Sequence, residues 1–159
     1  MKWIHSINSK ETIVTRINSA IPVKHLTDEM LLAEHREIKR LPVVLSKAVQ
    51  CNSISKVPNK FCLGTGHVKF FLNKMLFIFN RYKAIKNECI LRKFNIVDYS
   101  SNFLNIDDQY MNDYTPTKDE FNLLKERITE RIRNSNKQYF HYYGKRISKS
   151  EACSFLVTN

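Results

Sequence analysis

The feature that most limits how this chain can fold is an apolar stripe in the middle of its sequence. The stripe follows the turn Gly64-Thr65-Gly66, and its members, each three or four residues apart, are Val68, Leu72, Met75, Phe79, Tyr82, Ile85 and Cys89. This spacing puts the side chains on one face of a helix and predicts a long buried helix over residues 68–89. Only three Gly and four Pro occur in 159 residues, too few for a turn-rich β-sandwich. We therefore expect an all-α fold.

A helix is also predicted ahead of this stripe, over residues 27–41. Thr27 or Asp28 can cap its start, and its apolar side chains recur at helical spacing. Pro42 cannot continue the hydrogen-bond ladder, so we expect the helix to break or kink there. Residues 51–60 are predicted to form a loop.

The third predicted helix has a clear start. Pro116 precedes the capping box Thr117-Lys118-Asp119-Glu120. The apolar face that follows consists of Phe121, Leu124, Ile128 and Ile132. Three main helices in a chain of this length predict a single compact domain.

The charge of the chain indicates a polyanionic partner. Lys and Arg number 26 against 15 Asp and Glu, which gives a formal charge of +11. Residues 125–149 hold eight basic and two acidic side chains, whereas residues 94–117 contain no Lys or Arg. A basic face beside an acidic patch is typical of a nucleic-acid binder, and a merely solvated basic surface is the alternative.

Metal, membrane and export signals are weak. The four Cys and five His show no spacing typical of metal ligands, so we expect reduced structural thiols, no metal and no cofactor. No apolar run approaches the roughly 18 residues that span a bilayer, and no signal-peptide core follows Met1. These observations favour a cytoplasmic protein that does not bind membranes.

Two clusters carry candidate chemistry. In the segment 139–146, aromatic and basic residues alternate, so its tyrosines can stack on bases or pack the third helix onto the core. In the segment 34–40, Arg36 and Arg40 are one helical turn apart with Glu37 beside them. A carboxylate among cations can stabilise a cationic intermediate, and ordinary surface ion pairing is the alternative.

Five ordered segments are similar to one known family. They are Thr15-Arg-Ile-Asn18, His25 to Glu37, Leu63-Gly-Thr-Gly-His-Val-Lys-Phe-Phe71, Glu88 to Ile96 with Asn112-Asp-Tyr114 and Pro116, and Tyr142-Tyr-Gly-Lys145. Together they resemble the phage pyrimidine-dimer DNA glycosylases, the endonuclease V-type UV-repair enzymes. Two positions depart from the family pattern: Tyr139 stands for a tryptophan and Met30 for a histidine.

The resemblance implies an all-α domain of three helices with an extended N-terminal segment passing between them. It divides the chain into an extension at residues 1–14, a glycosylase-like domain at 15–147 and a tail at 148–159. The implied protein is a monomer that acts on double-stranded DNA containing a lesion.

The resemblance also implies a reaction. The α-amine of Thr15 attacks the sugar C1′ at a cyclobutane dimer, a Schiff base forms, and β-elimination cuts the strand. Glu37 is the essential carboxylate. The residues expected to bind DNA are Arg16, Arg36, Arg40, Arg127, Arg131, Tyr139, Tyr142 and Lys145.

Thr15 is internal in the chain as written, and an amide nitrogen is not a nucleophile because its lone pair is delocalised. Val14 precedes it, and a GUG valine codon can start translation as methionine. Removal of that methionine would expose Thr15, so we expect residues 1–14 to be an over-long start. Proteolytic trimming, an inactive DNA-binding relative and a glycosylase for another modified base are the alternatives. An RNA-binding or structural basic protein would leave the ordered segments unexplained.

Overall fold

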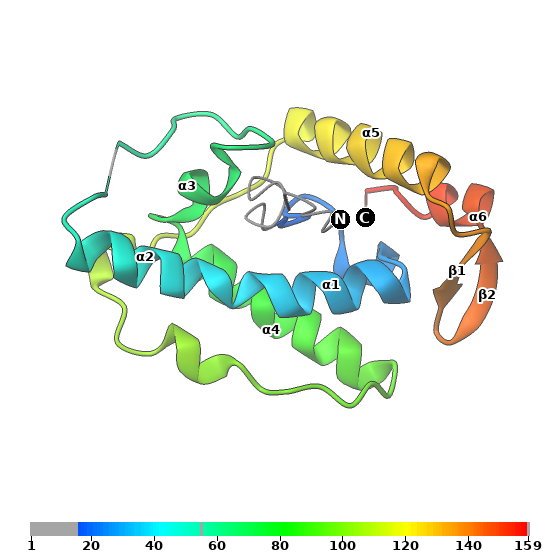
Figure 1. Ribbon diagram of the computed structural model, residues 1–159, viewed down its shortest axis with the longest axis horizontal. Coiled ribbons are helices and arrows are strands. Elements are labelled where there is room, and N and C mark those ends of the chain that lie inside the picture. The colour runs from blue at the N-terminus through cyan, green and yellow to red at the C-terminus, as the bar shows by residue number, and fades with distance from the viewer. Residues whose placement is uncertain (1–15, 55, 159) are drawn as a thin grey trace, which may run out of the picture.

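The computed structural model describes residues 16–54 and 56–158 of the chain. Most of these residues are helical, and one two-stranded antiparallel sheet accompanies them (Figure 1). The prediction of a helical fold is therefore confirmed, with a small hairpin that it lacked. Within the described ranges, no helix is long and apolar enough to cross a membrane.

The first predicted helix is two helices in the structure, α1 (Asp28–Ile38) and α2 (Arg40–Gln50). Thr27 caps α1 as expected, because its side chain accepts a hydrogen bond from the backbone N–H of Met30 at 3.3 Å. The break falls at Lys39, so the prediction that Pro42 ends the helix is wrong. Pro42 lies in the first turn of α2, where a backbone N–H has no helical partner to lose.

The helix predicted over residues 68–89 is also divided, into α3 (His67–Phe71) and α4 (Met75–Leu91). Lys74 leaves the helical conformation with φ −128° and ψ 41°. Its ammonium donates a hydrogen bond to the Phe70 carbonyl at 2.8 Å. This carbonyl at the end of α3 thereby gains a hydrogen-bond partner outside the helix. The apolar stripe still faces the core, with Met75, Tyr82 and Ile85 fully buried.

The third helix, α5 (Lys118–Asn134), begins where the capping box predicts. The Thr117 side chain accepts from the backbone N–H of Glu120 at 3.2 Å. The Glu120 carboxylate does not complete the box. It accepts hydrogen bonds from Ser19 and from Tyr114 instead, and so joins α5 to the start of the chain.

The segment after α5 forms the hairpin of β1 (Tyr139–Tyr142) and β2 (Lys145–Ser148), with Tyr139 opposite Ser148 and Tyr142 opposite Lys145. Tyr143 and Gly144 have φ of 50° and 74°, as a tight two-residue hairpin turn requires. The helix α6 (Lys149–Ser154) follows, and Ala152 and Leu156 in the C-terminal residues are fully buried. Short 3-10 turns occupy Val23–His25, Ser100–Phe103 and Asp108–Tyr110.

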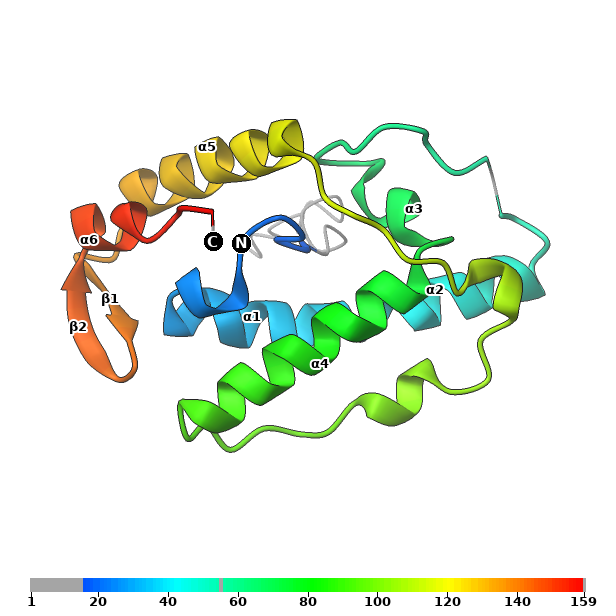
Figure 2. The same cartoon turned by 180° about the vertical axis from the view of Figure 1, so that it is seen from behind.

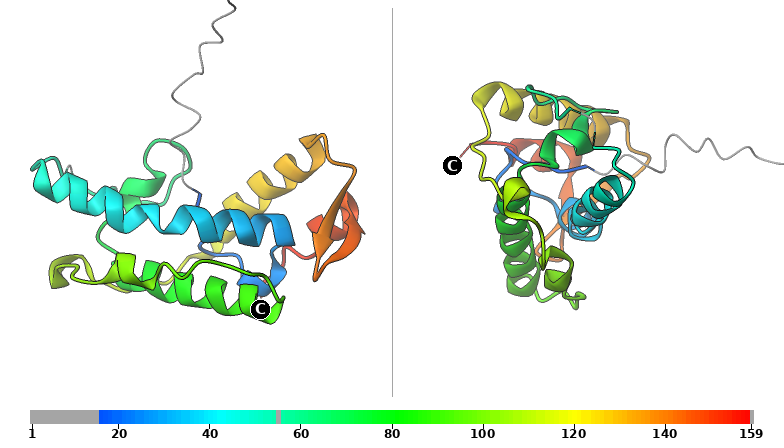
Figure 3. Two further views of the ribbon diagram at one scale, coloured as in Figure 1. Left: turned by 60° about the horizontal axis from the view of Figure 1, so that its bottom comes forward. Right: turned by 90° about the vertical axis from the view of Figure 1, so that its left-hand side faces the viewer.

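A segment without helix or strand, residues 16–22 and called the extended segment here, passes between α1 and α5 (Figures 1 and 2). It makes one turn, in which the Ile21 backbone N–H donates to the Asn18 carbonyl at 3.0 Å. Its side chains Ile17 and Ile21 are fully buried in the common hydrophobic core. Figure 3 shows α1 alongside α4, with α2 continuing from the end of α1 and the hairpin beyond the start of α1. From Arg16, where the described chain begins, the segment leads into the hydrophobic core.

Candidate functional site

A cleft of about 310 Å³ lies between α1, α5 and the start of the described chain. Arg16 comes from the extended segment, Glu37 from α1 and Arg131 from α5, and all three line this cleft. Met30, Lys137 and Phe140 also contribute to its walls. Residues that the sequence places more than 90 positions apart are thus gathered in one concave site.

Arg16, Arg131 and the exposed Arg127 form a group of mutually repelling guanidinium side chains, called the guanidinium cluster here, and of these Arg16 and Arg131 line the cleft whereas Arg127 does not. Burial, followed by the positive charges of Arg131 and Arg127, lowers the pKa of Arg16 to about 10. Partial desolvation and then Arg127 also lower the pKa of Arg131. None of the three forms a salt bridge with a carboxylate of the described residues.

One atom of the cluster lacks any partner. Nη1 of Arg16 is buried and finds no hydrogen-bond acceptor within the part of the chain that the structure describes. A buried donor left unpaired costs about 1–3 kcal/mol. An anion in the cleft would accept from this atom and offset the mutual repulsion of the three guanidinium groups.

Glu37 is one of two carboxylates that line the cleft, beside Glu34, and its side chain is 30% exposed. It pairs with Arg40, three residues later, at 2.9 Å, and Arg40 is 49% exposed. Arg36 lies on the exposed side of α1. The pair of Glu37 with Arg40 is the surface ion pairing that the spacing of residues 34–40 offered as the alternative reading.

Glu34, one turn before Glu37, holds the extended segment in place. Its side chain is 1% exposed and accepts from Asn18 twice, from the backbone N–H at 3.3 Å and from the side-chain amide at 2.9 Å. Arg81 on α4 donates to both carboxylate oxygens, at 2.9 and 3.1 Å. Arg81 also donates to the Ile21 carbonyl at 2.6 Å, so α4 contacts the segment directly at Ile21 and, through Glu34, indirectly at Asn18.

Further buried groups fix the rest of the segment. His67 accepts from the backbone N–H of Ile17 at 2.9 Å. Glu120 accepts from the Ser19 hydroxyl, and Arg92 donates to the Leu26 carbonyl at 2.8 Å. Side chains of α1, α3 and α4 therefore hold the backbone of the segment, and a side chain of α5 holds the Ser19 hydroxyl.

The hairpin places its candidate residues in different surroundings. Tyr139 is 40% exposed, and the Arg146 guanidinium lies 4.4 Å from its ring centroid. Tyr142 donates its hydroxyl to the Lys24 carbonyl at 2.9 Å and packs against Phe155. Lys145 is exposed at the start of β2. Neither Tyr142 nor Lys145 lines the cleft.

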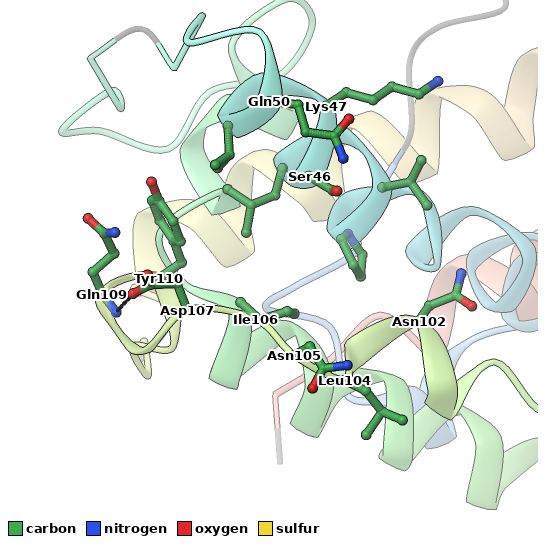
Figure 4. Close-up of a pocket in the computed structure, with 14 residues that line it drawn as sticks. Ser46, Lys47, Gln50, Asn102, Leu104, Asn105, Ile106, Asp107, Gln109 and Tyr110 are labelled. Carbon is green, nitrogen blue, oxygen red and sulfur yellow. Dashed lines mark hydrogen bonds between the residues drawn. The ribbon is translucent and has the colours of Figure 1, made fainter.

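A second hollow of about 700 Å³ lies between α2 and residues 102–110 (Figure 4). Asn102, Asn105 and Gln109 point toward it from one side, and Ser46 and Gln50 from the other. Its charged lining residues, Lys47 and Asp107, offset each other. This hollow shares no lining residue with the cleft and lacks the concentration of positive charge that a polyanion requires.

Several residues of the site were not assigned a role from the sequence. Asn18 and His67 stand in the segments that carry the resemblance, and this membership was their signal. Glu34 also stands in such a segment, and Glu120 belongs to the predicted capping box, but neither was expected to hold residues 16–22. Arg81 gave no signal, because its partners Glu34 and Ile21 are far away in the chain. Thr15, the expected nucleophile, and the extension 1–14 lie outside the described residues.

Together the fold and the cleft define a class of protein. A small helical domain with a concave cluster of guanidinium groups is typical of proteins that bind the phosphates of nucleic acids. The chain matches the family of pyrimidine dimer DNA glycosylases over residues 14–99, more than half of its length. It therefore belongs to this family, as the ordered segments predicted.

Proposed function

We propose that the protein is a DNA glycosylase with AP-lyase activity on cyclobutane pyrimidine dimers, and that the α-amine of Thr15 is its nucleophile. The observation that carries this proposal is the cleft in which Arg16, Glu37 and Arg131 meet. Arg16, which lines the cleft, directly follows Thr15 in the sequence, so the proposed nucleophile is the chain neighbour of a cleft residue.

The chemistry suits an α-amine at this place. Its pKa is near ~8, against about 10.4 for lysine, so far more of it is unprotonated at neutral pH. The nitrogen forms a bond to C1′, the bond between C1′ and the base breaks, and the released base takes up a proton. The bond between C1′ and the ring oxygen O4′ then breaks, O4′ takes up a proton, and the nitrogen keeps its remaining proton in the cationic Schiff base. Loss of a proton from C2′ then expels the 3′ phosphate.

Glu37 and the guanidinium cluster divide the remaining tasks. The Glu37 carboxylate stabilises the cationic intermediate and assists proton transfer at the opened sugar. Arg16, Arg127 and Arg131 bind phosphates, and a phosphate oxygen would supply an acceptor for the unpartnered donor Nη1 of Arg16. Arg36 and Arg40 add charge along the exposed side of the helices that carry them. Tyr139 provides an exposed ring for contact with bases.

The proposal requires a free amine at Thr15. The family match begins at residue 14, which leaves thirteen residues ahead of it. In a chain that retains those residues, Thr15 has an amide nitrogen and the protein would bind DNA without cleaving it. The intact mass of natively expressed protein separates the two forms.

Glu37→Gln tests the role of the carboxylate. We expect turnover on dimer-containing DNA to fall by about 10²–10⁴-fold, the usual contribution of such a group, with DNA affinity retained or increased. Glu126→Gln is the matched control, because Glu126 is exposed on α5 and does not line the cleft. Wild-type turnover in Glu37→Gln would contradict the assignment.

A further inference from the structure

His67 is a buried titratable group that the proposed reaction does not use. It begins α3, directly after the turn Gly64-Thr65-Gly66, and is 1% exposed. Gly64 has φ +85°, and a Cβ on Gly66 would meet Sγ of Cys62 at 2.5 Å. The turn therefore needs glycine at both positions, and it aims the imidazole into the core.

Both ring nitrogens of His67 have partners. Nε2 lies 2.9 Å from the backbone nitrogen of Ile17, which can only donate. Nδ1 lies 3.1 Å from the carbonyl oxygen of Cys62, which can only accept. A single tautomer satisfies both contacts: neutral imidazole with its proton on Nδ1.

The surroundings hold the ring in that state. Phe61 and Phe71 each meet it edge to face, with centroids 5.3 Å away. The charged groups that influence it are Arg16 from the extended segment and Glu34 from α1. Burial is the largest of the causes that lower the pKa of His67, so the imidazole is neutral at pH 7.

The hydrogen bond between His67 and the Ile17 N–H is the anchor of the segment that lies nearest to Thr15 in the chain. Ile17 follows Thr15 by two residues, and the other anchors of the segment, at Asn18, Ser19 and Ile21, lie further along. Two residues span at most ~7 Å, so the position of the Ile17 backbone restricts where the Thr15 amine can reach.

We propose that neutral His67 is a positioning residue that seats the N-terminal segment and thereby places the Thr15 amine against the sugar. This inference rests on the proposed function. Protonation of His67 removes the acceptor for the Ile17 N–H and puts a second cation beside Arg16. In acid the hydrogen bond that holds Ile17 is therefore lost. The imidazole touches neither the DNA nor the reacting atoms.

The test compares His67→Gln with His67→Phe, and uses His25→Gln as a control. A glutamine carbonyl can accept the Ile17 N–H and does not titrate, whereas phenylalanine fills the space without an acceptor. His25 is a second histidine near the segment, bonded to the Val157 carbonyl, and lies outside the cleft. Each protein is folded as the full chain and then cleaved by a specific protease just before Thr15.

Single-turnover rates of Schiff-base trapping are measured on abasic DNA from pH 5 to 8. We expect His67→Phe to react about 10–100-fold more slowly than wild type with similar DNA affinity, because a misplaced nucleophile loses reaction rate. His67→Gln should retain most of the rate. In the wild type and in His25→Gln, the logarithm of the rate should fall with a slope of one from amine protonation. It should fall more steeply only well into acid, below the ordinary histidine pKa of about 6.5, because burial lowers the pKa of His67 in the fold. His67→Gln should keep a slope of one.

A second readout does not depend on activity. Hydrogen exchange of the Ile17 amide in the uncleaved full chain should be slow in wild type and His67→Gln, and fast in His67→Phe. Equal exchange rates of the Ile17 amide in all variants would overturn the positioning role. An acid slope in His67→Gln as steep as that of the wild type would overturn it too. If the wild type forms no adduct while exchange of the Ile17 amide responds as expected, the proposed function fails, but the role of His67 in holding the Ile17 backbone stands. If His67→Phe does not fold, the pH slope of His67→Gln decides.

Discussion

The buried ion pair between Arg81 and Glu34 gives a stability prediction that the contacts make quantitative. Their side chains are 7% and 1% exposed. Arg81→Met removes two hydrogen bonds to Glu34 and one to the Ile21 carbonyl, while the apolar stem of the side chain is largely kept. Glu34 then retains a buried negative charge with Asn18 as its partner.

The size of the effect follows from burial. Removing one partner of a buried ion pair costs about 3–5 kcal/mol, because the remaining charge stays in a medium that solvates it poorly. The pair of Arg40 with Glu37 is the comparison, since its side chains are 49% and 30% exposed. A pair so exposed contributes about 0–1 kcal/mol. Arg40→Met is therefore a matched control for the same chemical change.

Urea unfolding of the full chain measures both variants. With a slope of about 1–3 kcal/mol per molar urea, Arg81→Met should lower the midpoint by at least about 1 M, and Arg40→Met by far less. The double variant Glu34→Met with Arg81→Met should recover part of the loss, because no uncompensated charge remains. A loss in Arg81→Met no larger than that in Arg40→Met would refute the reasoning.

Two further predictions concern DNA binding and pH. Arg131→Ala should reduce the slope of log K for DNA against log salt by about 0.9, the value for one phosphate contact. Lys83→Ala on α4 is the control and should leave the slope unchanged. Equal slopes in the wild type and both variants would argue against phosphate binding in the cleft. Burial is the largest cause that lowers the pKa of His35 and of His67 in the fold. Below about pH 6.5 the unfolded chain therefore binds more protons than the folded one, so stability should be full above that pH and fall on acidification. Denaturation midpoints between pH 5 and 8 check this, and His67→Gln should show a shallower decline; a midpoint that rises in acid would contradict it.

Much of the fold could be predicted because its signals are local. The Thr117 cap and the apolar face of α5 depend on residues within a few turns of one another, and both appear as expected. The hairpin was missed because its aromatic and basic residues looked like a binding segment and hid the turn at Tyr143 and Gly144. The divisions at Lys39 and Lys74 were missed because neither position carries a helix-breaking residue.

The candidate site was predictable only in part. Glu37 and Arg16 were singled out through the resemblance, and the structure brings them to one cleft. The groups that hold the extended segment were not foreseen. Arg81 is 47 residues from Glu34, and Ser19 is 101 residues from Glu120. No periodicity or spacing links such pairs, so only the folded chain reveals them.

Borohydride trapping on dimer-containing DNA tests the central claim most directly. Two preparations of the same folded protein are compared, one beginning at Thr15 with a free amine and one in which Thr15 is preceded by the extension. We predict a covalent protein–DNA adduct, with its mass increase located on the Thr15 residue, in the first preparation alone. Absence of an adduct with the free amine, or equal adducts in both preparations, would contradict the proposed mechanism.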